Sequence, residues 1–311
     1  STLPRPERRI TLEVLTLNVL HGLALPGGCA PDTDFCHAPT RVARLADALA
    51  ATCPELVSLQ EIGPRQRELV PDAVADVCDG AYRVLFEDHG IPDQEMILTT
   101  LAVVDDAFVD LSGLPWTGHR ARLDTPAGAV DVLATHLASS AFDPPCGDGT
   151  DPVTVCSASC PPGLEMGICN AREAVAALDE LAARLGPPAV ALVAGDLNAE
   201  PGSARIDEFI RAGYVDVWSL GGGAPCDADS RAGCTCCVGD GSGPLGGLDR
   251  PGGTPDERID LVLARVGGAC TLAVGAVSRL DVGPLDPPVD GLVWWSDHHG
   301  VLADLTVTCP G

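Results

Sequence analysis

Six short apolar runs, each with polar residues at one end, constrain the fold of this 311-residue chain more than any other feature. Runs of Val, Leu and Ala of this length predict buried β-strands. A buried strand has no structural reason to end in a carboxylate, an amide or an imidazole, so we expect these ends to meet at one site. An enzyme is therefore the leading hypothesis. The polar residues concerned are Asn18, Glu61, His136, Asp196, Asn198, Asp260, Asp297 and His298.

The position of these residues along the chain also predicts its domain organisation. They extend from Asn18 to His298, so a shared site requires nearly the whole chain to be one domain, residues 1–311. A chain of this length could otherwise form two ordinary domains. A hydrophobic content of 46% is sufficient for a large core.

Strand-like and helix-like segments alternate along the chain, which favours an α/β fold. A turn signal at Thr125–Gly128 predicts a hairpin between 120–123 and 130–136. Asn170 and Ser203 are candidate N-caps for two of the helices. We expect helices over 41–50, 64–78, 170–185 and 203–212, and further strands over 82–86, 95–104, 189–195, 259–264, 272–280 and 300–307.

The charge balance limits the possible partners. The net charge is −25, and all 19 basic residues are Arg. Such acidity argues against a broad electrostatic grip on nucleic acid, whose affinity comes largely from phosphate neutralisation. It does not exclude a nuclease, because a bound divalent cation supplies local positive charge.

The 14 cysteines predict a disulfide framework and therefore an exported protein, secreted or periplasmic. They are scattered through the chain, mostly in loops near 22–40, 139–169 and 220–256, and Cys29–Cys36 and Cys270–Cys309 are plausible pairs. A zinc cluster is the alternative for Cys226, Cys234, Cys236 and Cys237. The sequence contains no signal peptide or membrane span, and Ser1 is interpreted as a mature N-terminus.

The carboxylate Glu61 and the amide Asn18 end neighbouring strands and form a candidate metal site. Carboxylate and amide oxygens suit Mg²⁺, Mn²⁺ or Ca²⁺, which leave room for water and a substrate phosphate. The alternative interpretations are an exposed strand end for Glu61 and a turn residue for Asn18.

The segment Gly195-Asp196-Leu197-Asn198 is the sharpest single motif. Gly195 allows a close approach of backbone or ligand. Asp196 and Asn198 lie two residues apart, so both can face one side of an extended segment. The carboxylate can then orient an attacking water while the amide holds a phosphoryl oxygen.

Two histidines, His136 and His298, lie next to the ends of apolar strands and could stabilise charge or act as acids. Asp260 lies in an otherwise apolar strand, and a buried carboxylate needs a partner. A pair between Asp260 and His298 would satisfy the carboxylate and set the imidazole tautomer.

In sequence order, the motifs LNVLHG, LQE, THL, GDLNAEP, RID and SDHHG resemble those of the endonuclease/exonuclease/phosphatase superfamily, the deoxyribonuclease-I-like fold. The resemblance covers about residues 11–308. It implies a four-layer α/β/β/α sandwich of two mixed, mainly antiparallel sheets.

The resemblance also implies a role for each polar residue. Glu61 would be the principal metal ligand, with Asn18 assisting and Asp297 a further carboxylate on the metal side. Asp196 would position or deprotonate water, and Asn198 would hold the phosphate. The remaining roles fall to the histidines and their partner: His136 and His298 would flank the transition state, and Asp260 would orient His298.

The chain departs from the family pattern at two points. A phosphate-contacting Tyr of many family nucleases has no clear counterpart, because Tyr82 is the only Tyr between Glu61 and His136. Arg120 or Arg122 could take the part of the family's substrate-binding Arg, with only one of them expected to point inward.

These features predict a divalent-metal-dependent phosphodiester hydrolase that acts by in-line water attack, with Mg²⁺ the first expectation and Mn²⁺ or Ca²⁺ as alternatives. An extracellular nuclease or broad phosphodiesterase, acting on DNA or RNA, is the leading form. A sphingomyelinase-like or phospholipase-C-like enzyme, acting on lipid head groups, stays open. So does a non-catalytic partner-binding module, although no member of the catalytic set is missing. No stable protein partner is implied.

Overall fold

The computed structural model describes most of the chain, and Ser1 and part of the expected loop at 139–169 lie outside the described residues. The described residues are 7–24, 29–113, 115–139, 144–147, 154–227, 229–239 and 242–311.

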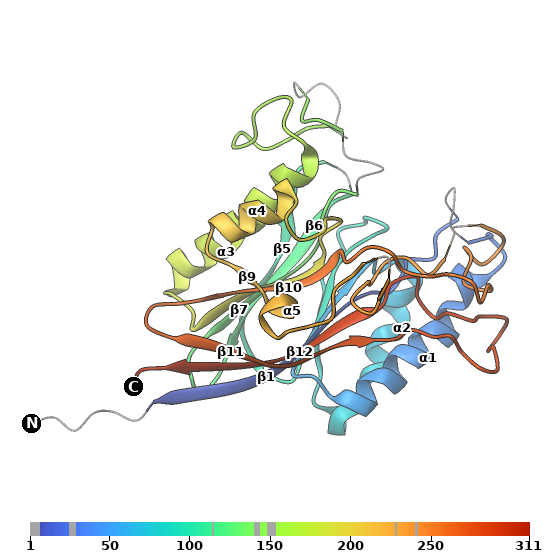
Figure 1. Cartoon of the computed structure of the whole chain (residues 1–311), viewed down its shortest axis with the longest axis horizontal. Helices are drawn as coiled ribbons and strands as arrows, with labels where there is room; N and C mark the ends of the chain where they lie inside the picture. Colours follow the sequence, from blue (N-terminus) through green and yellow to red (C-terminus); the bar gives the residue numbers. More distant parts are fainter. Residues whose placement is uncertain are drawn as a thin grey trace, which may run out of the picture.

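Two six-stranded sheets form the centre of the molecule (Figure 1). In each sheet one neighbouring pair is parallel, β1–β2 in the first and β7–β8 in the second, and the other pairs are antiparallel. The first sheet has the order β11 (Thr271–Leu280), β12 (Gly300–Cys309), β1 (Arg8–Asn18), β2 (Leu56–Gln60), β4 (Met96–Thr99) and β3 (Arg83–Leu85). The second has the order β5 (Ala102–Asp110), β6 (Thr117–Asp124), β7 (Val130–His136), β8 (Val190–Asp196), β10 (Asp260–Val266) and β9 (Val215–Asp216).

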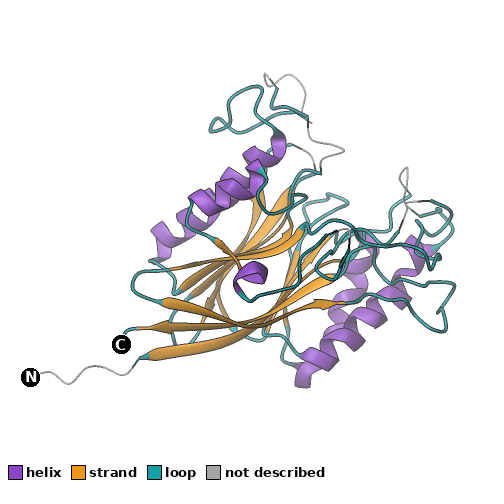
Figure 2. Cartoon of the chain, viewed as in Figure 1, coloured by secondary structure: helices purple, strands orange, loops and turns teal. Residues whose placement is uncertain are grey.

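Helices cover the outer face of each sheet (Figure 2). The first sheet is covered by α1 (Asp34–Thr52) and α2 (Pro64–Val74), which the 3₁₀ turn η1 (Val77–Gly80) follows. The second is covered by α3 (Met166–Leu185) and α4 (Ala204–Arg211). The short helix α5 (Val217–Leu220) places Trp218 in the core between the sheets. The predicted four-layer α/β/β/α sandwich is confirmed.

The layered arrangement explains why the strands are apolar on both faces. In β8, Leu192 and Ala194 pack between the two sheets, whereas Ala191 and Val193 pack under α3 and α4. Successive side chains of a strand point to opposite faces. A strand buried on both sides therefore has a continuous apolar run instead of an alternating one.

Two of the expected elements need correction. The apolar run at 95–104 is not one strand, because it bends after Thr99 and continues as β5 in the other sheet. Asn170 does not cap α3, which begins four residues earlier at Met166. The Asn170 side chain is buried inside the helix, where its amide accepts from Ala138 N and donates to Ser112 O. Ser203 does cap α4 and accepts a hydrogen bond from Ile206 N.

The cysteines form disulfides, including the predicted pairs Cys29–Cys36 and Cys270–Cys309. The four candidates for a zinc cluster form Cys226–Cys234 and Cys236–Cys237 instead. In the described part of the chain, no helix combines the length and the apolar character that a membrane crossing needs.

Strand register brings the polar strand ends together. Asn18 pairs with Gln60, the residue before Glu61, at the shared end of the parallel strands β1 and β2. In the second sheet, Asp196 pairs with His136 on one side and with Asp260 on the other.

Candidate active site

Asp196 lies at the centre of the site, at the end of β8 and almost completely buried. Its Oδ2 atom lies 3.6 Å from His136 Nε2 and 3.7 Å from His298 Nε2. It also accepts a hydrogen bond of 3.1 Å from Asn18 Nδ2, which belongs to the other sheet. Burial raises the pKa of Asp196 to about 6, although both imidazoles oppose the shift. A carboxylate with such a pKa can accept a proton near neutral pH.

The His298 side of the site has the predicted carboxylate–imidazole pair. Asp260 Oδ2 lies 2.9 Å from His298 Nδ1, and Asp260 has no solvent exposure. Burial alone would lower the pKa of His298, but the charges of Asp260 and Asp196 raise it well above its usual value. Because Nδ1 donates to Asp260, His298 Nε2 faces Asp196.

The His136 side has a carboxylate of its own, Asp93, which comes from the loop before β4. Asp93 Oδ2 lies 3.4 Å from His136 Nδ1, an ion-pair distance without hydrogen-bond geometry. Burial would lower the pKa of His136, but Asp93 and Asp196 outweigh it and raise the pKa to about 10. The indole of Trp116 packs edge-on against the His136 ring at 5.5 Å.

Glu61 stands at the end of β2 in a left-handed backbone conformation with φ of 59°. Its carboxylate accepts hydrogen bonds from Asn18 Nδ2 at 2.8 Å and His21 N at 3.1 Å. Burial would raise the pKa of Glu61, but the imidazoles of His21 and His136, with the amide of Asn18, lower it to about 2. Glu61 is therefore ionised at any physiological pH.

Asn18 reaches the site with its amide nitrogen toward the carboxylates. Asn18 Nδ2 bridges Glu61 and Asp196, while Oδ1 accepts from Leu20 N at 2.9 Å. This arrangement links the two sheets at the site and differs from the expected use of the amide oxygen toward a metal.

The carboxylates of Glu61 and Asp297 fit a divalent cation. Burial, with the charge of Glu61 adding to it, raises the pKa of Asp297. Asp297 Oδ1 is buried and has no hydrogen-bond partner among the described residues. An ion between two such carboxylates would offset their repulsion and satisfy this oxygen. The all-oxygen donor set is the one that Mg²⁺, Mn²⁺ and Ca²⁺ take.

The close packing of the main chain beside Asp196 explains why residue 195 is a glycine. A Cβ atom on Gly195 would lie 1.8 Å from Thr135 O of the neighbouring strand, so no larger residue fits there. Asn198 adopts a φ of 47°, and its main-chain N donates to Asp196 Oδ1 at 2.9 Å. Asn198 Nδ2 donates to Leu137 O at 2.8 Å, which holds the side chain beside the His136 strand.

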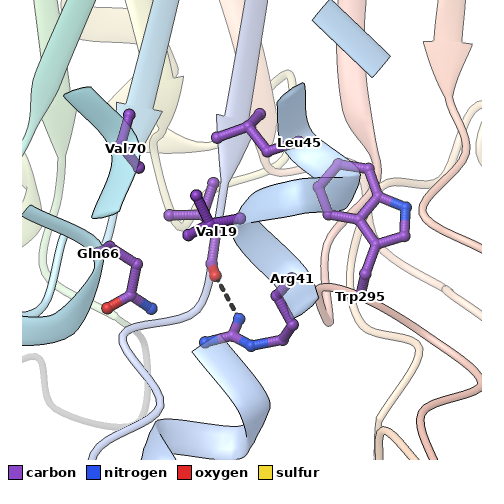
Figure 3. A pocket seen from close by; sticks show the side chains of 7 residues that line it. Val19, Arg41, Leu45, Gln66, Val70 and Trp295 are labelled. Atoms are coloured by element: carbon purple, nitrogen blue, oxygen red, sulfur yellow. Dashed lines mark hydrogen bonds between the residues drawn. The ribbon is translucent and has the colours of Figure 1, made fainter. Parts of the chain in front are cut away.

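Arg41, a buried residue of α1, supports the metal side of the site from behind. Its guanidinium donates to Val19 O at 2.6 Å, as Figure 3 shows, and to Leu20 O at 2.8 Å. Burial lowers its pKa to about 10, and the charges of Asp297 and Glu61 oppose this shift. Arg41 thus fixes the chain directly after Asn18 and places a buried positive charge near both carboxylates.

Arg120 and Arg122 are not brought to the site, which corrects their expected role in substrate binding. Residues two apart in a strand share a face, and both of these side chains reach toward α3. Arg120 Nη1 donates to Ala177 O at 3.0 Å. Arg122 forms a buried bidentate pair with Asp131 and donates to Gly186 O at the end of α3.

Sequence reasoning missed Asp93 and Glu95. Glu95 is buried, accepts a hydrogen bond from Thr117 Oγ1, and has a pKa raised to about 8 by burial and the charge of Asp93. Both residues precede an apolar strand, β4, which runs antiparallel to β2. A search for polar residues at both ends of each strand would have found Glu95, which directly precedes β4, but not Asp93, which lies two residues further into the loop.

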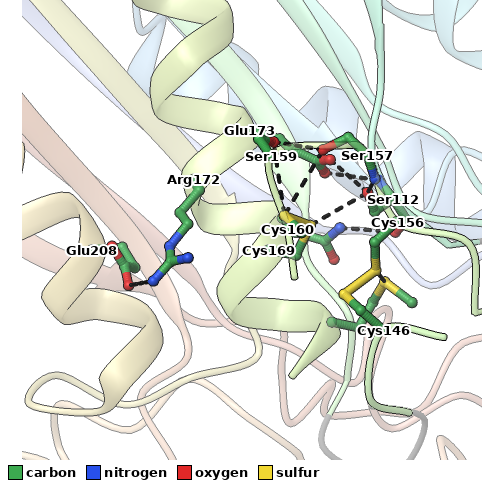
Figure 4. The surroundings of a disulfide bond; sticks show 12 residues. Ser112, Cys146, Cys156, Ser157, Ser159, Cys160, Cys169, Arg172, Glu173 and Glu208 are labelled. Carbon is green, nitrogen blue, oxygen red and sulfur yellow. Dashed lines mark hydrogen bonds and ion pairs between the residues drawn. A yellow bond between two sulfur atoms is a disulfide. The ribbon is translucent and has the colours of Figure 1, made fainter. Parts of the chain in front are cut away.

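The Cys-rich loops near 139–169 and 220–256 differ in their relation to the site. The first holds Cys146–Cys156 and Cys160–Cys169, which pack with Ser112 at the start of α3 (Figure 4). The second brings Cys237 Sγ to 3.8 Å from His298 Nε2.

Comparison with known proteins shows which family the chain matches. The model of the Endonuclease/Exonuclease/phosphatase family matches residues 15–298. No curated protein matches the chain.

Solved structures resemble the chain over almost its full length at low sequence identity. TDP2 from C. elegans is 17% identical with a TM-score of 0.63, covering 96% of this chain and 75% of its own. D. rerio TDP2 complexed with a single-strand DNA product is 15% identical with a TM-score of 0.59, covering 95% and 98%. An endonuclease/exonuclease/phosphatase from Bacteroides vulgatus is 12% identical with a TM-score of 0.63, again covering 95% and 98%. At these identities the likeness establishes the fold alone.

Proposed function

This chain belongs to the endonuclease/exonuclease/phosphatase family, and on that premise we propose that it is a divalent-metal-dependent phosphodiester hydrolase. The observation that carries the proposal is the position of Asp196, a buried carboxylate with a histidine on either side and Glu61 beyond Asn18. Structural packing does not require four titratable groups with little solvent access where the ends of the two sheets meet, and their burial without chemistry would be costly.

The cation that Glu61 and Asp297 would hold supplies positive charge to a bound phosphoryl group. Asp196 then accepts the proton of the attacking water, for which a pKa near 6 is suited. Asn198, held through Leu137, contributes an amide that can fix a phosphoryl oxygen.

The two histidines serve the charge that develops during attack. The surrounding carboxylates raise the pKa of His136 to about 10 and that of His298 well above its usual value, which favours the cationic form of both rings. Two cations on either side of Asp196 suit the added negative charge of a pentacovalent transition state. Asp260 orients His298 through a hydrogen bond, and the negative charge of Asp93 stabilises the protonated form of His136.

Among phosphodiesters, nucleic acid is the substrate that we propose first, hydrolysed outside the cell. The D. rerio TDP2 structure, with its single-strand DNA product, supports nucleic acid as a ligand that this fold accepts. The disulfides support an oxidising, extracellular or periplasmic location. The net charge of −25 favours binding to a short stretch of the nucleic-acid phosphate backbone over binding along an extended basic groove.

An activity panel tests the proposal. The purified chain is assayed with bis-p-nitrophenyl phosphate, plasmid DNA, RNA, sphingomyelin and a phosphomonoester, each with Mg²⁺, Mn²⁺ or Ca²⁺ and after exhaustive chelation. We expect hydrolysis of diesters, loss of activity on chelation and recovery with metal. Activity that survives chelation contradicts the metal assignment, and turnover of sphingomyelin alone would indicate a lipid phosphodiesterase. Absence of hydrolysis throughout the panel would favour a binding module.

A further inference from the structure

The Cys236–Cys237 disulfide touches a residue of the catalytic set. Cys237 Sγ lies 3.8 Å from His298 Nε2, the nitrogen that faces Asp196. Cys236 is buried, whereas Cys237 is partly exposed and lines an open cavity of about 530 Å³ beside the site. A solvent-borne reagent can therefore reach the sulfur pair.

The main chain holds this pair firmly against the catalytic segments. Cys236 N donates to Glu257 O at 3.0 Å, and Glu257 N returns a bond to Cys236 O. On the other side, Val238 N donates to Asp297 O at 2.8 Å. These bonds do not involve the sulfur atoms, so the two cysteines keep their place beside His298 when the disulfide opens.

The potential ligand atoms are close enough to share one ion. The sulfurs of Cys236 and Cys237 and a ring nitrogen of His298 lie within 4.8 Å of one another. Tetrahedral zinc with Zn–S of about 2.3 Å and Zn–N of about 2.05 Å places S and N roughly 3.6 Å apart. The observed 3.8 Å between Cys237 Sγ and His298 Nε2 is near this value.

The orientation of His298 also suits a metal. Because His298 Nδ1 is bound to Asp260 Oδ2, Nε2 is directed toward the sulfurs and Asp196, and it offers its lone pair to a metal once its proton is released. A histidine whose second nitrogen donates to a carboxylate is the usual arrangement behind a zinc ion.

We propose that reduction of the Cys236–Cys237 disulfide creates a site for a soft divalent cation such as Zn²⁺, formed by both thiolates and His298. Occupation of this site removes His298 from the reaction and stops hydrolysis, a consequence that rests on the proposed function. The oxidised pair has no thiolate to offer, so the site exists only after reduction.

The chemistry requires a dithiol as the reductant. The dithiol gives two electrons and two protons to the disulfide, which yields two cysteine thiols and an oxidised, cyclic reductant. Binding of Zn²⁺ then forms two Zn–S bonds and one Zn–N bond and releases three protons to solvent, one from each thiol and one from His298 Nε2. The hard-cation site at Glu61 and Asp297 contains no sulfur and prefers Mg²⁺.

Cobalt binding tests the site without reference to activity. Co²⁺ replaces Zn²⁺ as the probe, because thiolate ligands give it a near-ultraviolet charge-transfer band that oxygen ligands do not. The full chain is titrated before and after treatment with dithiothreitol, with the reductant removed anaerobically and excess Mg²⁺ present. We expect the band at one equivalent of Co²⁺ in the reduced protein and no band in the oxidised protein.

Variants separate this site from the other disulfides. Cys236→Ser leaves one permanent thiol beside His298 with no reductant needed, and it should give the band directly. The double variant Cys236→Ser/Cys237→Ser should give none. Cys53→Ser/Cys78→Ser, which removes an exposed disulfide between α1 and η1, is the matched control and should behave as the wild type after reduction.

Inhibition is measured on the same samples with Mg²⁺ present, and the reference for each protein is its own rate before Zn²⁺ is added. One equivalent of Zn²⁺ should lower hydrolysis roughly 10³-fold or more in the reduced wild type, the loss also expected when the His298 imidazole is removed. The double variant should keep its rate. The proposal is overturned if the folded, reduced wild type, with the thiols of Cys236 and Cys237 confirmed by mass spectrometry, gives no thiolate band, or if Zn²⁺ inhibits the double variant equally. If no substrate is hydrolysed, the proposed function fails, and the cobalt band still decides on this site.

Discussion

The two histidines on either side of Asp196 are held in different ways. His298 bonds at 2.9 Å to Asp260, a fully buried residue of β10 that is in strand register with Asp196. His136 faces Asp93 at 3.4 Å without a hydrogen bond, and Asp93 lies in a loop with its side chain 12% exposed. In each pair one partner is in strand register with Asp196 and the other lies in a loop. Strand register thus places the carboxylate of the first pair, whereas a loop supplies the carboxylate of the second.

This difference indicates separate contributions to the reaction. The Asp260–His298 pair has a defined tautomer and orientation, as an acid or charge-stabilising group requires. The Asp93–His136 pair provides mainly charge, because no hydrogen bond between Asp93 and His136 Nδ1 fixes the orientation of the ring. We therefore expect loss of the His298 pair to cost more than loss of the His136 pair.

Removal of either imidazole should cause the largest loss of activity and should test the difference between the two pairs most directly. His298→Ala should lower kcat/KM roughly 10³-fold to 10⁴-fold, and His136→Ala roughly 10²-fold, because each removes a positioned cation. Steady-state kinetics on a diester, with circular dichroism to verify folding, make the measurement. Full turnover by a folded His298→Ala protein would refute the mechanism, as would full turnover by Asp196→Ala.

Removal of the carboxylates is the next step and leaves both imidazoles in place. Asp260→Asn should lower kcat roughly 10²-fold or more, because the histidine loses its orientation. Asp93→Asn should cost only about tenfold, as expected of a supporting residue. Equal losses in the two variants, measured as kcat under saturating substrate, would contradict the distinction between the pairs.

The pH response tests the charge of His136. Its pKa is raised to about 10 in the folded protein, from 6.5, so the folded state favours the protonated ring. The resulting stability is present in full below pH 6.5 and is lost as pH rises toward about 10. In metal-free protein, NMR titration should give this elevated pKa, and Asp93→Asn should lower it. If the pKa of His136 is near 6.5 and Asp93→Asn does not change it, Asp93 does not act on His136.

The smallest effect is expected away from both pairs. Arg120→Ala should change kcat/KM by less than about twofold, because Arg120 contacts Ala177 O and not the site. Kinetics on plasmid DNA and on a small diester would verify this. A large rise in KM for DNA alone would restore Arg120 to substrate binding.

Most of the fold followed from local pattern, but two kinds of information did not. Asp260 was predicted as the partner of His298 because a carboxylate in an apolar strand demands one. Asp93 was not, because nothing local distinguishes a loop Asp that faces a histidine from one that faces water. The run at 95–104 was predicted as one strand because apolar periodicity does not record the bend at which β4 passes into β5.

The sequence by itself determined the family, the two-sheet sandwich and the identity of most polar groups at the strand ends, because a doubly buried strand tolerates such groups only at its ends. Tertiary structure alone decided that Arg120 and Arg122 face α3, that Asp93 faces His136, and that Cys237 contacts His298. These contacts join segments far apart in the chain. Strand register, sheet packing and loop path set them, and none of these is recorded in a local pattern of residues.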